Sequence, residues 1–255
     1  MADTNLYALI LALAAAVATG LIGGFALMKR MTLAGDAMSH IALPGLGLAI
    51  LWNVQPVLGA AAALALGALL IWKIEKRADL ATETTIGVIF SASLAIGALI
   101  TPSEDIIEAL FGGAEPVSII TLAIYLLLAA AVIIFVWKER SRLIISLFNR
   151  DLATVTGVNI SRLNLSYLLA FATTLVLGLR FLGALLVGAL IIIPAAISRQ
   201  FTHTLEKFLA GSAIASALSV AAGFWIAATF GLDTGPTIVS VAAGLFFLSL
   251  LKKKA

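Results

Sequence analysis

The sequence predicts an all-α, polytopic membrane protein with about nine transmembrane helices, and three observations carry this prediction. Hydrophobic residues make up 62% of the 255 residues and charged residues only 11%, whereas a soluble globular domain is about half apolar and a quarter charged. The mean hydropathy is +1.14. Apolar runs recur along the whole chain, and the basic residues gather in alternate connections between them.

Nine apolar runs approach the ~20 residues that a helix needs to cross about 30 Å of hydrocarbon. Charged residues, or turn residues such as Asn53–Pro56 and Gly231–Pro236, separate the runs. The first run has no basic segment before it and is long enough to span, so we expect it to be retained rather than removed as a signal peptide. The nine runs are Leu6–Met28, Leu33–Trp52, Val57–Trp72, Thr84–Ile100, Ser118–Trp137, Leu163–Leu179, Leu182–Ile197, Phe208–Phe230 and Thr237–Leu251.

The basic residues predict the orientation of these helices. With the N-terminus outside and the C-terminus in the cytoplasm, fifteen of the sixteen Lys and Arg residues fall in inner segments, and only Arg180 falls outside. Residues 1–255 then form a single transmembrane domain. Its longest connections are an acidic outer loop at about 101–117 and an inner loop at about 138–162, and neither is long enough to be a domain of its own.

Several classes of function lack the residues they need. The absence of cysteine excludes disulfides and thiolate chemistry. The G-x-x-x-x-G-K-[ST] loop of nucleotide hydrolases does not occur, nor do the H-E-x-x-H and G-x-S-x-G motifs of zinc proteases and serine hydrolases. We therefore expect no enzyme and no nucleic-acid partner. Many helices with few polar groups favour transport across the bilayer.

The second predicted span contains two ionisable residues, Asp36 and His40. Their i,i+4 spacing places both side chains on one helical face, and a carboxylate with an imidazole suits zinc, manganese or ferrous iron. Pro44 has no N–H, so the carbonyl of His40 loses its helical partner. Pro44 and Pro194 are predicted helix breaks, while Gly35 would let another helix or an ion approach the pair closely.

Other interpretations of these residues stay open. Asp36 follows Lys29 and Arg30 closely, so it could be an acid at a helix N-terminus that the helix dipole stabilises. A lone His40 could be a hydrogen-bonded core histidine. If the pair does bind metal, two ligands do not close a site, and a two-fold dimer would supply four.

Two further polar regions are less specific. His203 lies in a predicted cytoplasmic turn between Arg199 and Lys207, where we expect a solvated side chain. The outer acidic residues could attract cations, or could equally form a solvated loop or a docking surface. These outer acids are Glu104, Asp105 and Glu108.

Three stretches of the chain also resemble a known family. Gly35–His40 (GDAMSH), followed by Leu43–Gly45 (LPG), resembles the G-D-A-x-S-H-x-x-L-P-G signature of the metal-ion permeases of ATP-binding-cassette importers. Arg180–Ala196 and Gly235–Val239 are similar to two later stretches of that family. The likeness covers nearly the entire chain.

The resemblance implies a homodimeric permease with a fold like that of the cobalamin-type importers, in a bacterial cytoplasmic (inner) membrane. It implies cytoplasmic ATP-binding subunits and an extracytoplasmic protein that delivers zinc, manganese or iron. Asp36 and His40 would line the path of this transported metal, and the chain would need no cofactor of its own. The inner loop would hold the helix that couples to the ATPase.

In the coupling segment of that family an acid, an alanine and a glycine recur, which here are Asp151, Ala153 and Gly157. Asn149 stands where many relatives carry an acid. From the residues alone, a proton-coupled metal transporter with Asp36 and His40 as a relay, or a cation channel, remains an alternative.

Overall fold

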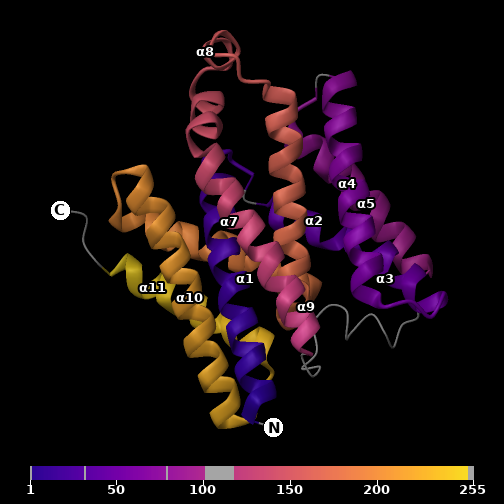
Figure 1. Cartoon of the computed structure of the whole chain (residues 1–255), viewed down its shortest axis with the longest axis vertical. Helices are drawn as coiled ribbons and strands as arrows, with labels where there is room; N and C mark the ends of the chain where they lie inside the picture. The colour runs from indigo at the N-terminus through magenta and orange to yellow at the C-terminus, as the bar shows by residue number, and fades with distance from the viewer. Residues whose placement is uncertain (1, 32, 79, 101–117, 252–255) are drawn as a thin grey trace.

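The computed structural model describes residues 2–31, 33–78, 80–100 and 118–251, which form helices joined by short connections (Figure 1). These four ranges contain no strand, so the predicted all-α membrane fold is confirmed. The outer acidic loop predicted at 101–117 lies outside the described residues. The helices are α1 (Ala2–Met28), α2 (Ala34–His40), α3 (Ala42–Leu51), α4 (Pro56–Ala78), α5 (Thr82–Ile100), α7 (Ile119–Phe148), α8 (Arg150–Val155), α9 (Ile160–Phe201), α10 (Leu205–Phe230) and α11 (Thr234–Leu250).

Each predicted apolar run coincides with an apolar helical segment of the structure. Within the described ranges, seven of these segments are long and apolar enough to cross a membrane. Two more, Leu186–Phe201 and Thr234–Leu250, are apolar but shorter. At a rise of 1.5 Å per residue they extend about 24 and 26 Å, less than the ~30 Å of hydrocarbon. The positions of the runs are confirmed, whereas nine spans and their orientation remain predictions.

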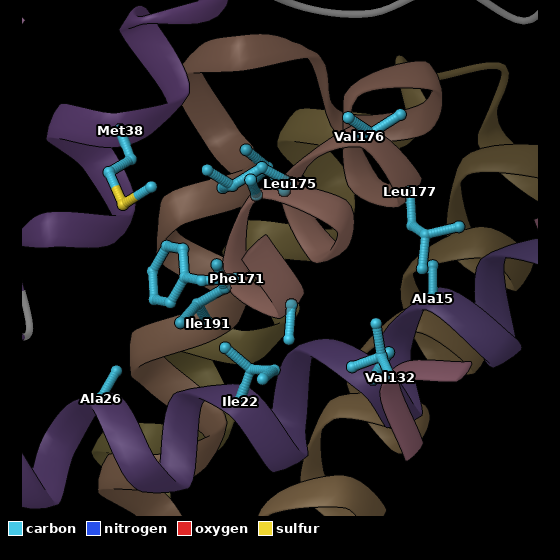
Figure 2. Close-up of a cluster of buried hydrophobic side chains, with 14 of the residues drawn as sticks. Ala15, Ile22, Ala26, Met38, Val132, Phe171, Leu175, Val176, Leu177 and Ile191 are labelled. Atoms are coloured by element: carbon cyan, nitrogen blue, oxygen red, sulfur yellow. The ribbon is translucent and has the colours of Figure 1, made fainter. Parts of the chain in front are cut away.

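The central helix of the fold is α9, which packs against α1, α2, α4, α7, α10 and α11. Tyr167, Phe171 and Leu175 lie one turn apart on its first half and are fully buried. Figure 2 shows Phe171 and Leu175 in one apolar cluster with Ile22 of α1 and Met38 of α2. This cluster fixes the position of α2 against the centre of the molecule.

The break in α9 lies at Gly183, not at Pro194 as the sequence predicted. Gly183 has φ 69° and ψ 174°, the one non-helical conformation within α9, in a region that almost only glycine adopts. An added Cβ at Gly178 would collide with the side chain of Val187, although residues nine apart in a straight helix are about 13.5 Å apart. The chain therefore folds back at Gly183, and the second half of α9 continues through Pro194 as helix.

The predicted inner loop at 138–162 is mostly helical. α7 continues to Phe148, α8 follows at once, and α9 begins at Ile160. The charged residues that end the apolar run after Trp137 include Lys, Glu and Arg, which are good helix formers. Hydropathy thus marked the end of the apolar segment and not the end of the helix. Figure 1 shows α8 at one end of the molecule, far from the N-terminus.

Candidate metal site and coupling segment

The second span divides into two helices beside the candidate ligands. α2 ends at His40, and Ile41 forms the junction with α3. The N–H of Ile41 donates to the Met38 carbonyl at 3.0 Å, which is a tighter turn than an α-helix makes. Pro44 lies in the first turn of α3, where its missing N–H would have no helical partner in any case. Local sequence therefore explains why the break falls directly after His40.

Asp36 and His40 lie on the same face of α2, as their spacing predicted. His40 Nε2 is 3.9 Å from Asp36 Oδ1. The His40 side chain is 13% exposed and packs against Phe90 of α5, with 5.5 Å between the ring centres, whereas the Asp36 side chain is 56% exposed. A carboxylate exposed on an apolar helix is costly in hydrocarbon, so a polar or charged group must cover this face in the membrane.

The hydrogen-bonding groups of the His40 ring are not all paired within the described residues. Its Nδ1 atom is buried and has no hydrogen-bond partner among the residues that the structure describes. A metal-binding histidine usually donates its second ring nitrogen to a carbonyl or carboxylate. The two nitrogens therefore face different surroundings, with Nε2 turned toward Asp36 and Nδ1 toward the protein.

Glycines bring the second half of α9 against the backbone of α2. An added Cβ at Gly188 would lie 2.7 Å from the nitrogen and 2.9 Å from the Cα atom of Asp36. An added Cβ at Gly35 would lie 3.4 Å from the Gly188 Cα atom. The close approach predicted at Gly35 is confirmed, and its partner is a helix. Asp36 is thus held from behind by α9 while its side chain points outward.

The described part of one chain brings no third His, Cys, Asp or Glu side chain to this pair. In ranges 2–31, 33–78, 80–100 and 118–251, no group of three or more His, Cys, Asp or Glu side chains could hold a metal ion. His203 is exposed in the connection between α9 and α10. A closed site would therefore need ligands from a second copy, from water or from outside the described residues.

The coupling segment predicted from the family resemblance contains α8. Asn149 caps this helix, because its Oδ1 accepts from the N–H of Leu152 at 2.9 Å. An aspartate would accept the same bond, so Asn149 retains the geometry that an acid provides. Asp151 is exposed in the first turn of α8, Ala153 is fully buried, and Gly157 turns the chain with φ 80°.

Exposed apolar side chains lie on α8 and directly before it. Phe148 is 87% exposed, Leu152 is 54% exposed and Val155 is 85% exposed. Leu152 and Val155 belong to α8, which lies at one end of the molecule in Figure 1, and Arg150 and Asp151 separate them from Phe148 in the sequence. Contiguous apolar groups beside charged residues are typical of a protein interface.

Comparison with known proteins agrees with the motifs. The family model of the ABC 3 transport family matches residues 1–253. The chain belongs to this family. The predicted resemblance to metal-ion permeases of ATP-binding-cassette importers is thereby confirmed.

Membrane proteins from two bacteria are similar to this chain over most of its length. The high-affinity zinc uptake system membrane protein ZnuB of Haemophilus influenzae is 29% identical, covering 97% of each chain. The manganese transport system membrane protein MntC of Listeria monocytogenes is 29% identical and covers 96% of this chain and 89% of its own.

Two solved structures share the fold. PsaBC from Streptococcus pneumoniae in complex with Fab has a chain that is 27% identical, with a TM-score of 0.82 over 96% of this chain and 90% of that chain. An inward-facing conformation of a putative metal-chelate type ABC transporter is 18% identical with a TM-score of 0.68, covering 95% of this chain and 85% of that chain. The second likeness concerns the fold alone.

The sequence did not indicate several residues that the structure places at the candidate metal site and at α8. Gly188 packs against Asp36 only because the chain reverses at Gly183, and a single sequence does not show that reversal. The apolar residues around α8 fell within the predicted inner loop at 138–162, and none of them was singled out as a surface. Phe148 was an indication of this exposed surface, because it lies after a charged stretch and directly before a helix cap.

Proposed function

We propose that the chain is the transmembrane permease subunit of an ATP-driven importer of divalent transition metal ions, with Asp36 and His40 lining the ion path. The observation that carries the proposal is this oxygen–nitrogen pair, 3.9 Å apart, in a membrane helix of an ABC 3 transport family member. The relatives named for zinc and manganese uptake support these two metals. Carboxylate and imidazole ligands also suit ferrous iron.

The metal path forms between two copies of the chain. Asp36 turns its carboxylate outward from one copy, and the described part of the chain supplies no third ligand beside it. Two copies related by a two-fold axis would contribute two carboxylates and two imidazoles, which is a full tetrahedral set. The wide exposure of Asp36 would allow the ion to leave again, as transport requires. His40 binds metal only when its imidazole is neutral, so acid weakens uptake.

The cytoplasmic ATP-binding subunit would contact α8. Phe148, Leu152 and Val155 supply exposed apolar area, and Asp151 supplies a charge beside it. Ala153 and Gly157 shape the segment, because the first packs inward and the second turns the chain toward α9. The basic inner segments support an orientation with α8 in the cytoplasm of a bacterial inner membrane, with the metal-delivering binding protein on the outer side.

The test is metal accumulation in a strain that lacks the gene, complemented with wild type, His40→Ala or Asp36→Asn. Cell-associated zinc, manganese and iron are measured under metal limitation at equal expression. We expect wild type to restore one metal and both variants to restore roughly a tenth of that or less, since each removes a ligand. His203→Ala is the matched control, because His203 is exposed and remote in sequence from the pair.

Two results would overturn the proposal. If no metal responds to the wild-type gene, the chain is not a metal importer subunit. If both variants restore full uptake, Asp36 and His40 are not in the ion path. Uptake that persists without an ATPase partner would instead favour the proton-coupled transporter or the channel.

A further inference from the structure

A polar bridge joins three helices at the end of the molecule where α8 lies. Asn164, in the second turn of α9, donates from Nδ2 to Glu75 Oε2 of α4 at 2.6 Å. Its Oδ1 accepts from the ammonium group of Lys29, directly after α1, at 2.7 Å. One amide therefore links a cation on one helix to an acid on another, and both bonds involve a charged group.

Two further contacts hold the same helices together. Trp72 Nε1 lies 3.0 Å from the Ser161 carbonyl and 2.9 Å from its Oγ atom, and donates to both. The Lys29 ammonium lies 4.3 Å from the ring centre of Tyr167, which is fully buried on α9. Trp72 precedes Glu75 by one turn of α4, and Ser161 precedes Asn164 by one turn of α9, so matching faces meet.

The bridge borders a cavity of about 780 Å³ between the ends of α1, α4, α5, α7 and α9. Lys29, Trp72, Glu75, Ser161 and Asn164 all line it. Apolar side chains do not fill this space, and a void transmits no packing force. Hydrogen bonds of the lining residues therefore add to the direct packing of α1 and α4 against α9 where this cavity separates their ends. Glu75 Oε1 is buried and accepts no hydrogen bond within the described part of the chain, so Asn164 is the residue that holds this carboxylate.

The bridge is connected through short chain segments to both candidate sites of the molecule. On one side, α8 ends at Val155, and α9 starts at Ile160 with Asn159 capping it through a 3.0 Å bond to the N–H of Arg162. Asn164 is one turn further along α9. A displacement of α8 therefore reaches Asn164 through a short, hydrogen-bonded connection.

On the other side of the bridge, Lys29 precedes the candidate ligand Asp36 by seven residues. The N–H of Met31 donates to the Ala26 carbonyl at 2.9 Å, and the N–H of Ala34 to the Met31 carbonyl at 3.1 Å. Met31 is buried, so this residue is held against the end of α1. A shift of Lys29 is thus passed to α2, which carries Asp36.

We propose that Asn164 is a positioning residue that transmits movement of the α8–α9 segment to the α2 ion path. The inference rests on the proposed function, because it requires an ATPase subunit acting at α8. The hydrogen bonds of Asn164 go to Lys29 and Glu75, and neither of these residues is a candidate ligand or part of α8. Loss of Asn164 should therefore separate ATP hydrolysis from metal movement without abolishing either partner's binding.

The experiment measures metal ions moved per ATP hydrolysed by the complete transporter in lipid vesicles, with zinc and manganese each offered. For Asn164→Leu we expect this ratio to fall roughly tenfold, while ATP hydrolysis stays within about twofold of wild type. Ser166→Ala is the control, since Ser166 lies two residues away on α9, is exposed, and is outside the bridge.

An exchange of the two polar groups separates a positioning role from a purely structural one. Asn164→Asp alone places two carboxylates together and should also lower the ratio. Adding Glu75→Gln exchanges the acid and the amide, so a carboxylate still accepts from Lys29 and an amide still donates across the pair. We expect this double variant to recover to within about threefold of wild type, because hydrogen bonds and net charge are both restored.

Three results would overturn the inference. The first is a wild-type ratio for Asn164→Leu, and the second is a double variant no better than Asn164→Asp. The third is loss of assembly in all three variants, which would assign Asn164 to folding. If wild type itself moves neither metal, the proposed transport of zinc and manganese fails as well, so the two failures are distinguishable.

Discussion

Replacing Gly188 by alanine tests whether the backbone position of Asp36 controls transport. The added Cβ would lie 2.7 Å from the Asp36 nitrogen and 2.9 Å from its Cα atom, where ordinary contact begins at 3.4 Å. Both neighbours are backbone atoms, so no side chain can turn away. Restoring ordinary contact requires α2 to move by about 3.4 − 2.7 = 0.7 Å relative to α9.

The size of the effect follows from this shift. Overpacking of this kind costs about 1–3 kcal/mol, whereas glycine to alanine in a helix otherwise gains up to about 1 kcal/mol. Gly87→Ala on α5 is the matched control, because an added Cβ there meets nothing within 4 Å. The difference in stability between the two variants therefore isolates the collision. A misplacement near 1 Å can reduce a positioned reaction on the order of 100-fold, so we expect metal uptake to fall at least roughly tenfold.

The assay compares metal uptake at equal membrane expression with thermal unfolding in detergent. Gly188→Ala should melt at a lower temperature than Gly87→Ala and should transport far less. Full uptake by Gly188→Ala, together with a melting temperature equal to that of Gly87→Ala, would refute the reasoning. In that case the contact between α9 and α2 does not hold Asp36 in place.

Three other predictions concern α8 and the reversal in α9. Asn149→Ala should cost about 1 kcal/mol through loss of the helix cap and lower ATPase stimulation, whereas Asn149→Asp should retain both. Leu152→Glu should reduce co-purification of the ATPase subunit roughly tenfold without lowering the yield of the permease, and undiminished co-purification would contradict the interface. Gly183→Ala should cost about 1–3 kcal/mol because φ is 69° there. Its yield of folded protein should fall below that of Gly244→Ala, whose added Cβ would enter open space.

The sequence predicted those features of the structure that depend on residues close together in the chain. The bilayer demands long apolar helices, so hydropathy located the apolar helical segments that the structure describes. Spacing of four residues placed Asp36 and His40 on one face, and the structure puts the paired atoms 3.9 Å apart. The proline at position 44 also predicted a break that falls between α2 and α3.

Long-range relations could not be predicted in this way. Pro194 is tolerated inside α9, while Gly183 reverses the chain, and both look alike as small interruptions of apolar sequence. Asn164 and Glu75 are 89 positions apart, so no pattern in either helix indicates their bond. The inner loop was expected to begin at 138, whereas α7 continues to Phe148, because charge ends a membrane segment without ending a helix.

The reversal at Gly183 bears on how the chain enters the membrane during synthesis. Leu186–Phe201 holds 16 residues and extends about 24 Å, too little to reach both surfaces of the bilayer alone. It would be inserted together with Ile160–Arg180 as one hairpin, and a translocation reporter after Phe201 should therefore depend on both halves being present. Gly183 would then be needed during insertion, after α1 and α2 have been synthesised and before the chain beyond Phe201 follows.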